Sequence, residues 1–251
     1  MKFRIKIFAD GADVQSILRL SQNPLIAGYT TNPTLMRKAG VSDYKRFAQE
    51  VLAVVKDKPV SFEVLSDEFD EMEAQAKEIA SWAANVYVKI PITNTRGESS
   101  VALIERLTKA AVKLNVTAML TIEQVKAVLP AMRGATGGYI SIFAGRVADA
   151  GVDPEPIMVE ALNLLKEYPA LELLWASPRE VFNVVQAERI GCHVITLTDD
   201  VLKKLSLIGK NLDEFSLETV KMFYNDAVAA GYELPTGNLH ITARAIAPAV
   251  H

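Results

Sequence analysis

Short apolar segments alternate with longer amphipathic segments along most of the chain. The short segments are rich in β-branched and aromatic residues, which is typical of strands. They lie at residues 3–9, 25–29, 59–65, 85–90, 115–120, 138–143, 171–176 and 193–197. The segments between them repeat Ala, Leu, Val and Ile at helical spacing. These lie at residues 12–21, 33–39, 43–56, 67–83, 98–113, 122–132, 155–167 and 179–190. The pattern therefore predicts eight strands that alternate with helices.

Strands that alternate with helices form parallel sheets, and eight strands in roughly 210 residues predict a single-domain α/β protein, the (β/α)8 TIM barrel. A doubly wound open sheet is the alternative, but no Gly-x-Gly-x-x-Gly turn follows the first strand to support it. Further helices are predicted at residues 200–205 and 216–230. We expect residues 1–232 to form the barrel with its additional C-terminal helix. Residues 233–251 have weak periodicity and are interpreted as an extension or a vector-derived tail.

Composition and charge narrow the class of protein. The 251 residues are 50% hydrophobic and 23% charged, as is ordinary for a soluble globular chain. A net charge of −3 argues against binding to nucleic acid or to an anionic membrane. The sequence shows neither a membrane-spanning apolar run nor a signal-peptide core. The single cysteine, Cys192, excludes an intramolecular disulfide and fits a reducing compartment, so we expect a cytoplasmic protein.

Lys89 is the most informative residue, because it lies inside the apolar run Asn85–Pro91. An ammonium in such a run loses hydration, which disfavours its charged form. A neutral lysine amine is a nucleophile toward carbonyl groups, as in Schiff-base enzymes. The other interpretation is a lysine whose stem covers apolar surface while its head stays in water. The position of Lys89 near the end of the fourth strand favours the first interpretation, since barrels place their chemistry at the carboxyl ends of the strands.

Other candidate residues also fall at the carboxyl ends of predicted strands. They are Asp10, Thr31, Asn32, Glu63, Asn115, Thr117, Ser141, Phe143, Arg146, Ser177 and Arg179. Each has a simpler structural explanation: Asp10-Gly11 suits a turn, for example, and Glu63 with Lys89 could form a buried ion pair. Their concentration at one end of a barrel nevertheless predicts a functional site.

These positions closely resemble the transaldolase family. The matching stretches run in the family's order between about residues 5 and 225. They are Phe8-Ala9-Asp10, Thr30-Thr31-Asn32-Pro33, Phe62-Glu63-Val64, Val88-Lys89-Ile90-Pro91, Asn115-Val116-Thr117, Ser141-Ile142-Phe143-Ala144-Gly145-Arg146, and Ala176-Ser177 with Arg179. Thr-Thr-Asn-Pro and Val-Lys-Ile-Pro together are the most specific signals.

The resemblance implies an enzyme of carbohydrate metabolism, a transferase of the pentose phosphate pathway. It would move a dihydroxyacetone unit from sedoheptulose 7-phosphate or fructose 6-phosphate to glyceraldehyde 3-phosphate or erythrose 4-phosphate. Lys89 would form the Schiff base, Asp10 would be the general acid/base, and Glu63 with Thr117 would move protons through a water. The substrate-binding residues implied are Thr31, Asn32, Asn115, Ser141, Phe143, Arg146, Ser177 and Arg179. No metal and no cofactor is implied, and the partners would be sugar phosphates.

Two alternatives stay open. Fructose-6-phosphate aldolases of the same family release free dihydroxyacetone and commonly carry Gln and Tyr where this chain has Glu63 and Phe143. Since phenylalanine cannot donate a hydrogen bond to a catalytic water, Phe143 favours transfer. The other alternative is a non-catalytic barrel that binds sugar phosphates. The loop after the fourth strand adds Arg96, which is either a ligand for an anionic substrate or a solvated loop residue.

We also expect a homo-oligomer. Short transaldolases tend to form rings in which C-terminal helices pack on neighbouring subunits. The helix expected at Phe215–Ala230 has an apolar face that includes Leu217, Val220, Phe223 and Tyr224. That face could equally pack on its own barrel.

Overall fold

The computed structural model describes residues 3–11 and 13–234. The chain divides into two compact units, Met1–Ser206 and Leu207–His251. The larger unit is a closed barrel of eight strands in sequence order. The strands are β1 (Lys6–Asp10), β2 (Ile26–Thr30), β3 (Val60–Glu63), β4 (Val86–Pro91), β5 (Leu114–Met119), β6 (Gly138–Ile142), β7 (Leu171–Trp175) and β8 (Val194–Leu197). All neighbours are parallel, and β8 pairs with β1 to close the ring.

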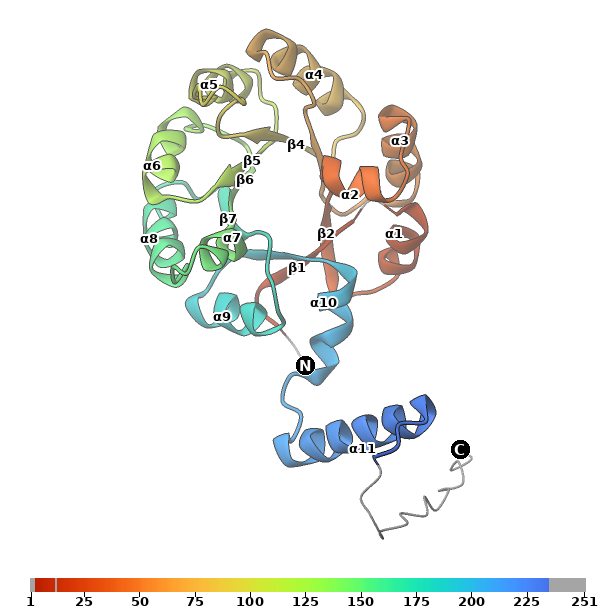
Figure 1. Cartoon of the computed structure of the whole chain (residues 1–251). Coiled ribbons are helices and arrows are strands. Elements are labelled where there is room, and N and C mark those ends of the chain that lie inside the picture. Colours follow the sequence, from red (N-terminus) through yellow and green to blue (C-terminus); the bar gives the residue numbers. More distant parts are fainter. Residues whose placement is uncertain (1–2, 12, 235–251) are drawn as a thin grey trace. The chain divides into compact units, whose positions relative to one another are not determined.

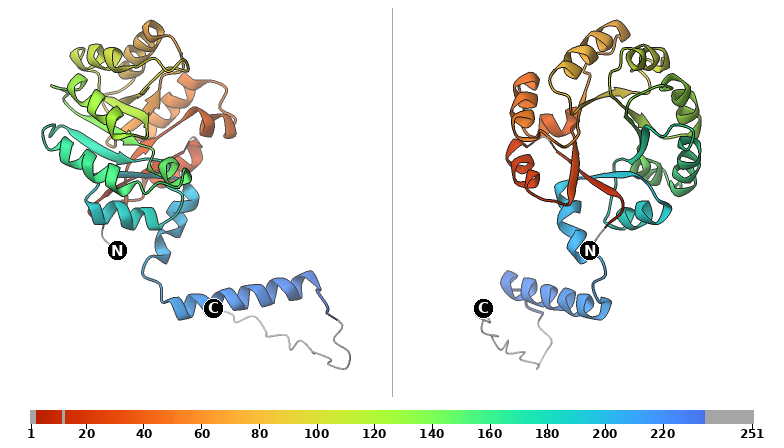
Figure 2. Two further views of the ribbon diagram at one scale, coloured as in Figure 1. Left: turned by 60° about the vertical axis from the view of Figure 1, so that its left-hand side comes forward. Right: turned by 180° about the vertical axis from the view of Figure 1, so that it is seen from behind.

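Helices surround this ring of strands (Figure 1). In the larger unit they are α1 (Val14–Ser21), α2 (Pro33–Lys38), α3 (Tyr44–Val54), α4 (Phe69–Ser81), α5 (Val101–Lys109), α6 (Ile122–Ala131), α7 (Ala144–Asp149), α8 (Glu155–Leu165), α9 (Phe182–Ile190) and α10 (Asp199–Lys204). Short α2 and α7 lie inside the outer ring of helices, and Figure 2 shows the barrel from behind. The (β/α)8 barrel predicted from the sequence is confirmed.

Two apolar layers hold the barrel together. The larger one packs the outward faces of the strands against the helices, with Ile7, Val88 and Leu173 among its fully buried members. A smaller cluster around Phe8 and Tyr139 fills the inside of the barrel, and the two aromatic rings meet edge to face with their centroids 5.5 Å apart. The interior is therefore a packed core in which polar residues stand out.

Local signals explain several helix ends. Asn32 caps α2 by accepting from the backbone N–H of Leu35, directly before Pro33 at the first helical position. Thr121 and Gln124 form a capping box at the start of α6. The helix expected at residues 67–83 begins at Phe69, and the Ser66 hydroxyl accepts the N–H of Glu68 in the turn before it.

The sequence does not predict α7. Its six residues are too few for a periodic pattern. The helix also begins one residue after the predicted strand 138–143 ends, so no separate start signal precedes it. The 3-10 turn Leu205–Leu207 overlaps the helix predicted at residues 200–205 by one residue and extends beyond it.

The smaller unit contains α11 (Leu212–Ala230), which covers the predicted helix and begins earlier. Asn211 caps it by accepting from two backbone N–H groups, and Gly231 ends it in the left-handed region. Residues 235–251, most of the segment interpreted as a tail, lie outside the described residues. Within the described part, none of the helices combines the length and apolar character needed to cross a membrane.

Candidate active site

Strand register places the candidate residues side by side. Parallel neighbours that pair in register present their side chains to the same face of the sheet. Glu63 of β3 pairs with Lys89 of β4, which pairs with Asn115 of β5. Asp10 of β1 pairs in the same way with Thr30 of β2. The residues predicted from separate strand ends therefore meet inside the mouth of the barrel.

Lys89 is buried, with 6% of its surface exposed. Its Nζ lies 3.0 Å from Oε2 of Glu63 and donates to the backbone carbonyl of Thr31 at 2.9 Å. The solvated-head interpretation of Lys89 is therefore wrong in this structure. A buried ammonium needs a paired charge and hydrogen-bond acceptors, and these two contacts supply both. The same contact puts a carboxylate within reach of a lysine proton.

Asp10 lies in the same mouth. It accepts from the Thr30 hydroxyl at 2.8 Å and from the Asn32 amide at 3.4 Å. Burial raises the pKa of the Asp10 carboxyl above its ordinary value, and the nearby Glu63 carboxylate adds to the rise. The Lys89 ammonium and the two hydrogen bonds act in the opposite direction on this pKa. Asp10 is thus a carboxyl group suited to gain and lose a proton.

A polar chain crosses the barrel interior beside Lys89. The Ser141 hydroxyl donates to Oδ1 of Asn115 at 2.6 Å, and the Asn115 amide donates to Oγ of Ser61 at 3.0 Å. All three residues are buried. The chain fixes the orientation of the Asn115 amide. Thr31 is also buried, but its hydroxyl donates to the Ser61 carbonyl, so the contact of Thr31 with Lys89 is through its backbone.

Thr117 and Phe143 complete the wall. Thr117 pairs with Pro91 of β4, and its hydroxyl is buried without a hydrogen-bond partner among the described residues. The register with β4 places this hydroxyl on the same face of the sheet as Lys89. Phe143 is half-buried at the start of α7 and packs against the inner apolar cluster.

The two candidate phosphate ligands lie on exposed, adjacent segments. Arg179 pairs with Asp149 at the end of α7, through Nε at 3.0 Å and through a second contact from Nη2. That guanidinium holds the pKa of the Asp149 carboxyl below its usual range, and the charge of Arg146 contributes. Arg146 lies over the Phe143 ring at 5.9 Å.

Gly145 of α7 lies very close to the loop that follows β7. A Cβ on Gly145 would stand 1.6 Å from the Ser177 carbonyl oxygen, so only glycine fits there. Ser177 itself is in the left-handed region, with φ of 59°. These two positions bring the arginines of α7 and of the loop after β7 together.

Arg96 is bound within its own loops. Its guanidinium contacts the carboxylates of Asp67, Glu68 and Glu98 at 2.7–3.3 Å. Thr95 also donates to Asp67, so the loops after β3 and β4 are joined. Three carboxylates around one cation leave no net positive charge for an anionic substrate.

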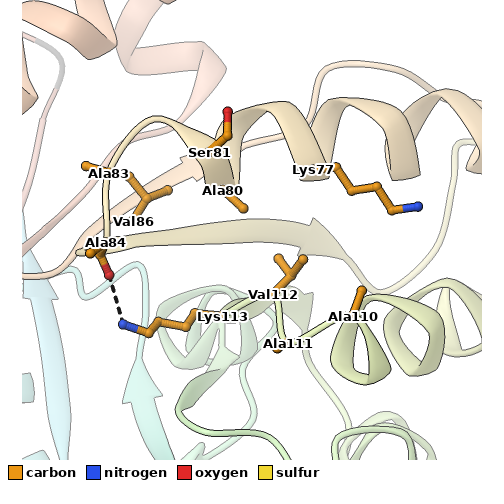
Figure 3. A pocket seen from close by; sticks show the side chains of 10 residues that line it. All are labelled: Lys77, Ala80, Ser81, Ala83, Ala84, Val86, Ala110, Ala111, Val112 and Lys113. Carbon is orange, nitrogen blue, oxygen red and sulfur yellow. Dashed lines mark hydrogen bonds between the residues drawn. The ribbon is translucent and has the colours of Figure 1, made fainter.

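Among residues 3–11 and 13–234, the opposite end of the barrel holds no comparable set of polar side chains. An open groove of about 600 Å³ lies beside the start of β4, between the ends of α4 and α5 (Figure 3). Half of its ten lining residues are alanine, and Lys113 donates to the Ala84 carbonyl at 2.8 Å. Cys192 is buried, which raises the pKa of its thiol to about 12, and Nδ1 of His193 accepts from the Leu173 backbone. Both residues precede β8.

Sequence reasoning missed residues that support the site. The Thr30 hydroxyl, not that of Thr31, reaches Asp10, and Thr196 of β8 contacts Thr30 at 2.5 Å. The hydroxyl of Tyr44 bonds the backbone of Glu63 on both its N–H and its carbonyl. Strand alternation from Asn32 back to Thr30 could have identified Thr30. Nothing in the apolar run Val194–Leu197 marks Thr196.

A family model and individual relatives indicate the same protein family. The model of the transaldolase/fructose-6-phosphate aldolase family matches residues 7–234. A probable transaldolase of Dehalococcoides mccartyi is 35% identical over 202 residues, covering 80% of this chain and 90% of that protein. A probable transaldolase of Streptococcus agalactiae is 36% identical over 215 residues, covering 84% of this chain and 95% of that protein.

More distant solved structures share the fold alone. A mandelate oxidase mutant has a TM-score of 0.53 and 14% identity, with 76% of this chain and 64% of that chain covered. A flavocytochrome b2 mutant has a TM-score of 0.52 at the same identity, and the chain spans 56% of its length. These two likenesses concern the barrel and not its chemistry.

Proposed function

Since the chain belongs to the transaldolase/fructose-6-phosphate aldolase family, we propose that it transfers a dihydroxyacetone unit between sugar phosphates through a Schiff base on Lys89. Membership supports an enzyme of the transaldolase or aldolase type. The observation that carries the finer proposal is the buried Lys89 with Glu63 at 3.0 Å and Asp10 in the same mouth. Binding alone would need neither this amine nor two carboxyl groups beside it.

Formation of the Schiff base begins with loss of a proton from Lys89. Glu63 is the acceptor within reach, and the neutral amine then attacks the C2 carbonyl of the ketose. The resulting carbinolamine loses its C2 hydroxyl as water, which requires a proton on that oxygen. Glu63 and the unpaired Thr117 hydroxyl are the groups proposed to move this proton through a water.

Asp10 is the proposed base for cleavage of the carbon–carbon bond. It takes the proton of the C4 hydroxyl while the C3–C4 electron pair moves into the iminium, giving an enamine on Lys89 and a free aldose. The raised pKa of Asp10 makes it a stronger base than an exposed aspartate, which suits this step. Attack of the enamine on a second aldose returns the proton from Asp10 to the new hydroxyl.

The remaining residues are proposed to hold the sugar. Asn32 and Asn115 would bind the dihydroxyacetone hydroxyls, with Ser141 fixing the Asn115 amide. Arg146 and Arg179, with Ser177, would bind the phosphate, because the planar guanidinium matches its oxygens. Thr31 would contribute through its carbonyl, which bonds Lys89.

Transfer is favoured over release of free dihydroxyacetone. Release of dihydroxyacetone requires that the enamine carbon gain a proton and that water then attack the iminium. Phe143 stands at the site wall without a hydrogen-bonding group, so it cannot hold a water for these steps. The second candidate is therefore a fructose-6-phosphate aldolase. Because the chain belongs to this family, we also propose that its partners are sugar phosphates and that it acts in the cytoplasm.

A product assay tests this proposal. Fructose 6-phosphate with erythrose 4-phosphate should yield sedoheptulose 7-phosphate and glyceraldehyde 3-phosphate, and Lys89→Met should abolish the reaction. Lys113→Met, at the far end of the barrel, is the control and should keep wild-type rates. Equal release of dihydroxyacetone without the acceptor would support the aldolase instead. Binding of sugar phosphate without turnover by the wild type would leave only the non-catalytic barrel.

A further inference from the structure

Thr196 is a buried hydroxyl in an apolar strand. Its neighbours in β8 are Val194, Ile195 and Leu197, and 5% of Thr196 is exposed. The strand needs no side-chain hydroxyl for its backbone pairing with β1. Burial of a hydroxyl costs free energy unless the group is hydrogen-bonded. The contact that Thr196 makes is with Oγ1 of Thr30, at 2.5 Å.

The direction of these hydrogen bonds follows from counting protons. Ionised Asp10 can only accept, so Thr30 must donate its one hydroxyl proton to Oδ1 of Asp10, at 2.8 Å. The proton between the two threonines then comes from Thr196. The chain therefore runs from Thr196 to Thr30 to Asp10, across β8, β2 and β1.

The Thr30 bond is the shorter of the two side-chain bonds to Asp10. The Asn32 amide donates at 3.4 Å, a weak length. The charged groups that face Asp10 are Lys89 of β4, which lowers its pKa, and Glu63 of β3, which raises it. Lys89 directs its own contacts to Glu63 and to the Thr31 carbonyl. Hydrogen bonding to the Asp10 anion thus depends mainly on Thr30.

We propose that Thr196 is a positioning residue of the active site, which fixes the Thr30 hydroxyl with its proton directed at Asp10 and so keeps Asp10 ready to accept the substrate proton. A hydroxyl that accepts a hydrogen bond is a stronger donor, and a charged acceptor gains most from this polarisation. The role in catalysis rests on the proposed function. The direction of these hydrogen bonds can also reverse once Asp10 is protonated, because each hydroxyl can both donate and accept.

A carboxyl titration tests the inference without any turnover. In protein carrying carbon-13 at the aspartate carboxyls, the Asp10 signal is identified by its loss in Asp10→Asn. We expect Thr196→Val to raise the Asp10 midpoint by roughly 0.5–1 pH unit, since the isosteric side chain removes the donor to Thr30. Thr196→Ser should restore the wild-type midpoint. The acidic limb of the kcat/KM profile should move in the same direction.

A double-mutant cycle separates this role from packing. In a Thr30→Val background the Thr196→Val change should no longer move the Asp10 midpoint, because its effect passes through Thr30. An unchanged midpoint in Thr196→Val, or in Thr196→Ala should the valine variant fail to fold, would overturn the inference. The inference and the proposed function fail separately. If the Asp10 midpoint shifts in Thr196→Val but the wild type transfers no dihydroxyacetone, the proposed function is contradicted and the hydrogen-bond inference stands.

Discussion

At the scale of single residues, the site balances two carboxyl groups against one ammonium. Glu63 takes the direct contact with Lys89, whereas Asp10 is bound by hydroxyl and amide donors. Desolvation is the main cause of the raised pKa of Asp10, and the Glu63 carboxylate beside the same ammonium adds to the rise. The different partners of Asp10 and Glu63 support their different proposed roles.

Replacement of Asp10 by Asn should separate stability from activity. Burial raises the folded-state pKa of Asp10 above 3.8, so its contribution to stability is full below the unfolded pKa and is lost as pH rises through the folded pKa. We expect Asp10→Asn to unfold at a higher temperature than the wild type at pH 7, with the difference shrinking as the pH is lowered. The same variant should lose about 10²–10⁴-fold in kcat.

Thermal melts between pH 5 and pH 8 and steady-state kinetics measure both effects. A loss of stability in Asp10→Asn that grows with pH would contradict this account of the Asp10 environment. Retained kcat would contradict its role as the base.

Arg179→Gln tests the phosphate site. A hydrogen bond to a charged group contributes about 1.5–3 kcal/mol, which corresponds to roughly 10–100-fold in affinity. We expect the KM for fructose 6-phosphate to rise by about that factor, while turnover of unphosphorylated fructose stays at the wild-type level. Arg133→Gln, which removes a guanidinium stacked on Tyr168, is the control. Equal losses with both sugars would place Arg179 outside the phosphate site.

Residue chemistry was predictable from the sequence only where a motif carried it. Lys89, Glu63 and Asp10 stood out because ionisable groups are unusual in apolar strands, and the structure brings them together. Thr30 and Thr31 are the same residue type, so residue type alone did not distinguish them. In the structure the Thr30 hydroxyl reaches Asp10, whereas the Thr31 hydroxyl donates to the Ser61 carbonyl. The contribution of Thr196 depends on a contact between strands distant in sequence.

At the scale of elements, α7 is the feature that the sequence left out. Its position depends on the approach of Gly145 to the Ser177 carbonyl. Such a contact joins two loops that are 32 residues apart, and no local pattern encodes it. The same short helix carries Arg146 and Asp149, so its placement decides the geometry of the proposed phosphate site.

Gly145→Ala should disturb this geometry. The added Cβ would overlap the Ser177 carbonyl, and such overpacking costs about 1–3 kcal/mol. We expect a lower unfolding temperature and a raised KM for phosphorylated donors. Ala148→Gly, at an exposed position of α7, weakens the helix without touching Ser177 and should leave that KM unchanged. Identical kinetics for Gly145→Ala and the wild type would refute the role of this contact.

At the scale of the whole molecule, the count of alternating segments sufficed for the barrel. Eight β-rich runs with helices between them leave few other parallel arrangements, and the closed sheet agrees. The arrangement of subunits has no such signature. Within α11 taken by itself, apolar side chains are exposed at Leu217, Val220, Phe223 and Tyr224, and we propose that this face packs on a neighbouring subunit.

The mass of the protein in solution tests that expectation. Light scattering after gel filtration should give a multiple of 27.4 kDa, and the pair Val220→Glu with Phe223→Glu should reduce it. Lys221→Glu adds negative charge to an exposed polar position of the same helix and serves as the control. A monomeric wild type would contradict the expectation.

The Schiff base on Lys89 is the central claim, and borohydride trapping tests it most directly. The protein is incubated with fructose 6-phosphate, reduced, digested and analysed by mass spectrometry. We expect one reduced dihydroxyacetone adduct, on the peptide that contains Lys89, and none in Lys89→Arg. Substrate turnover without an adduct on Lys89, or an adduct that persists in Lys89→Arg, would contradict the account.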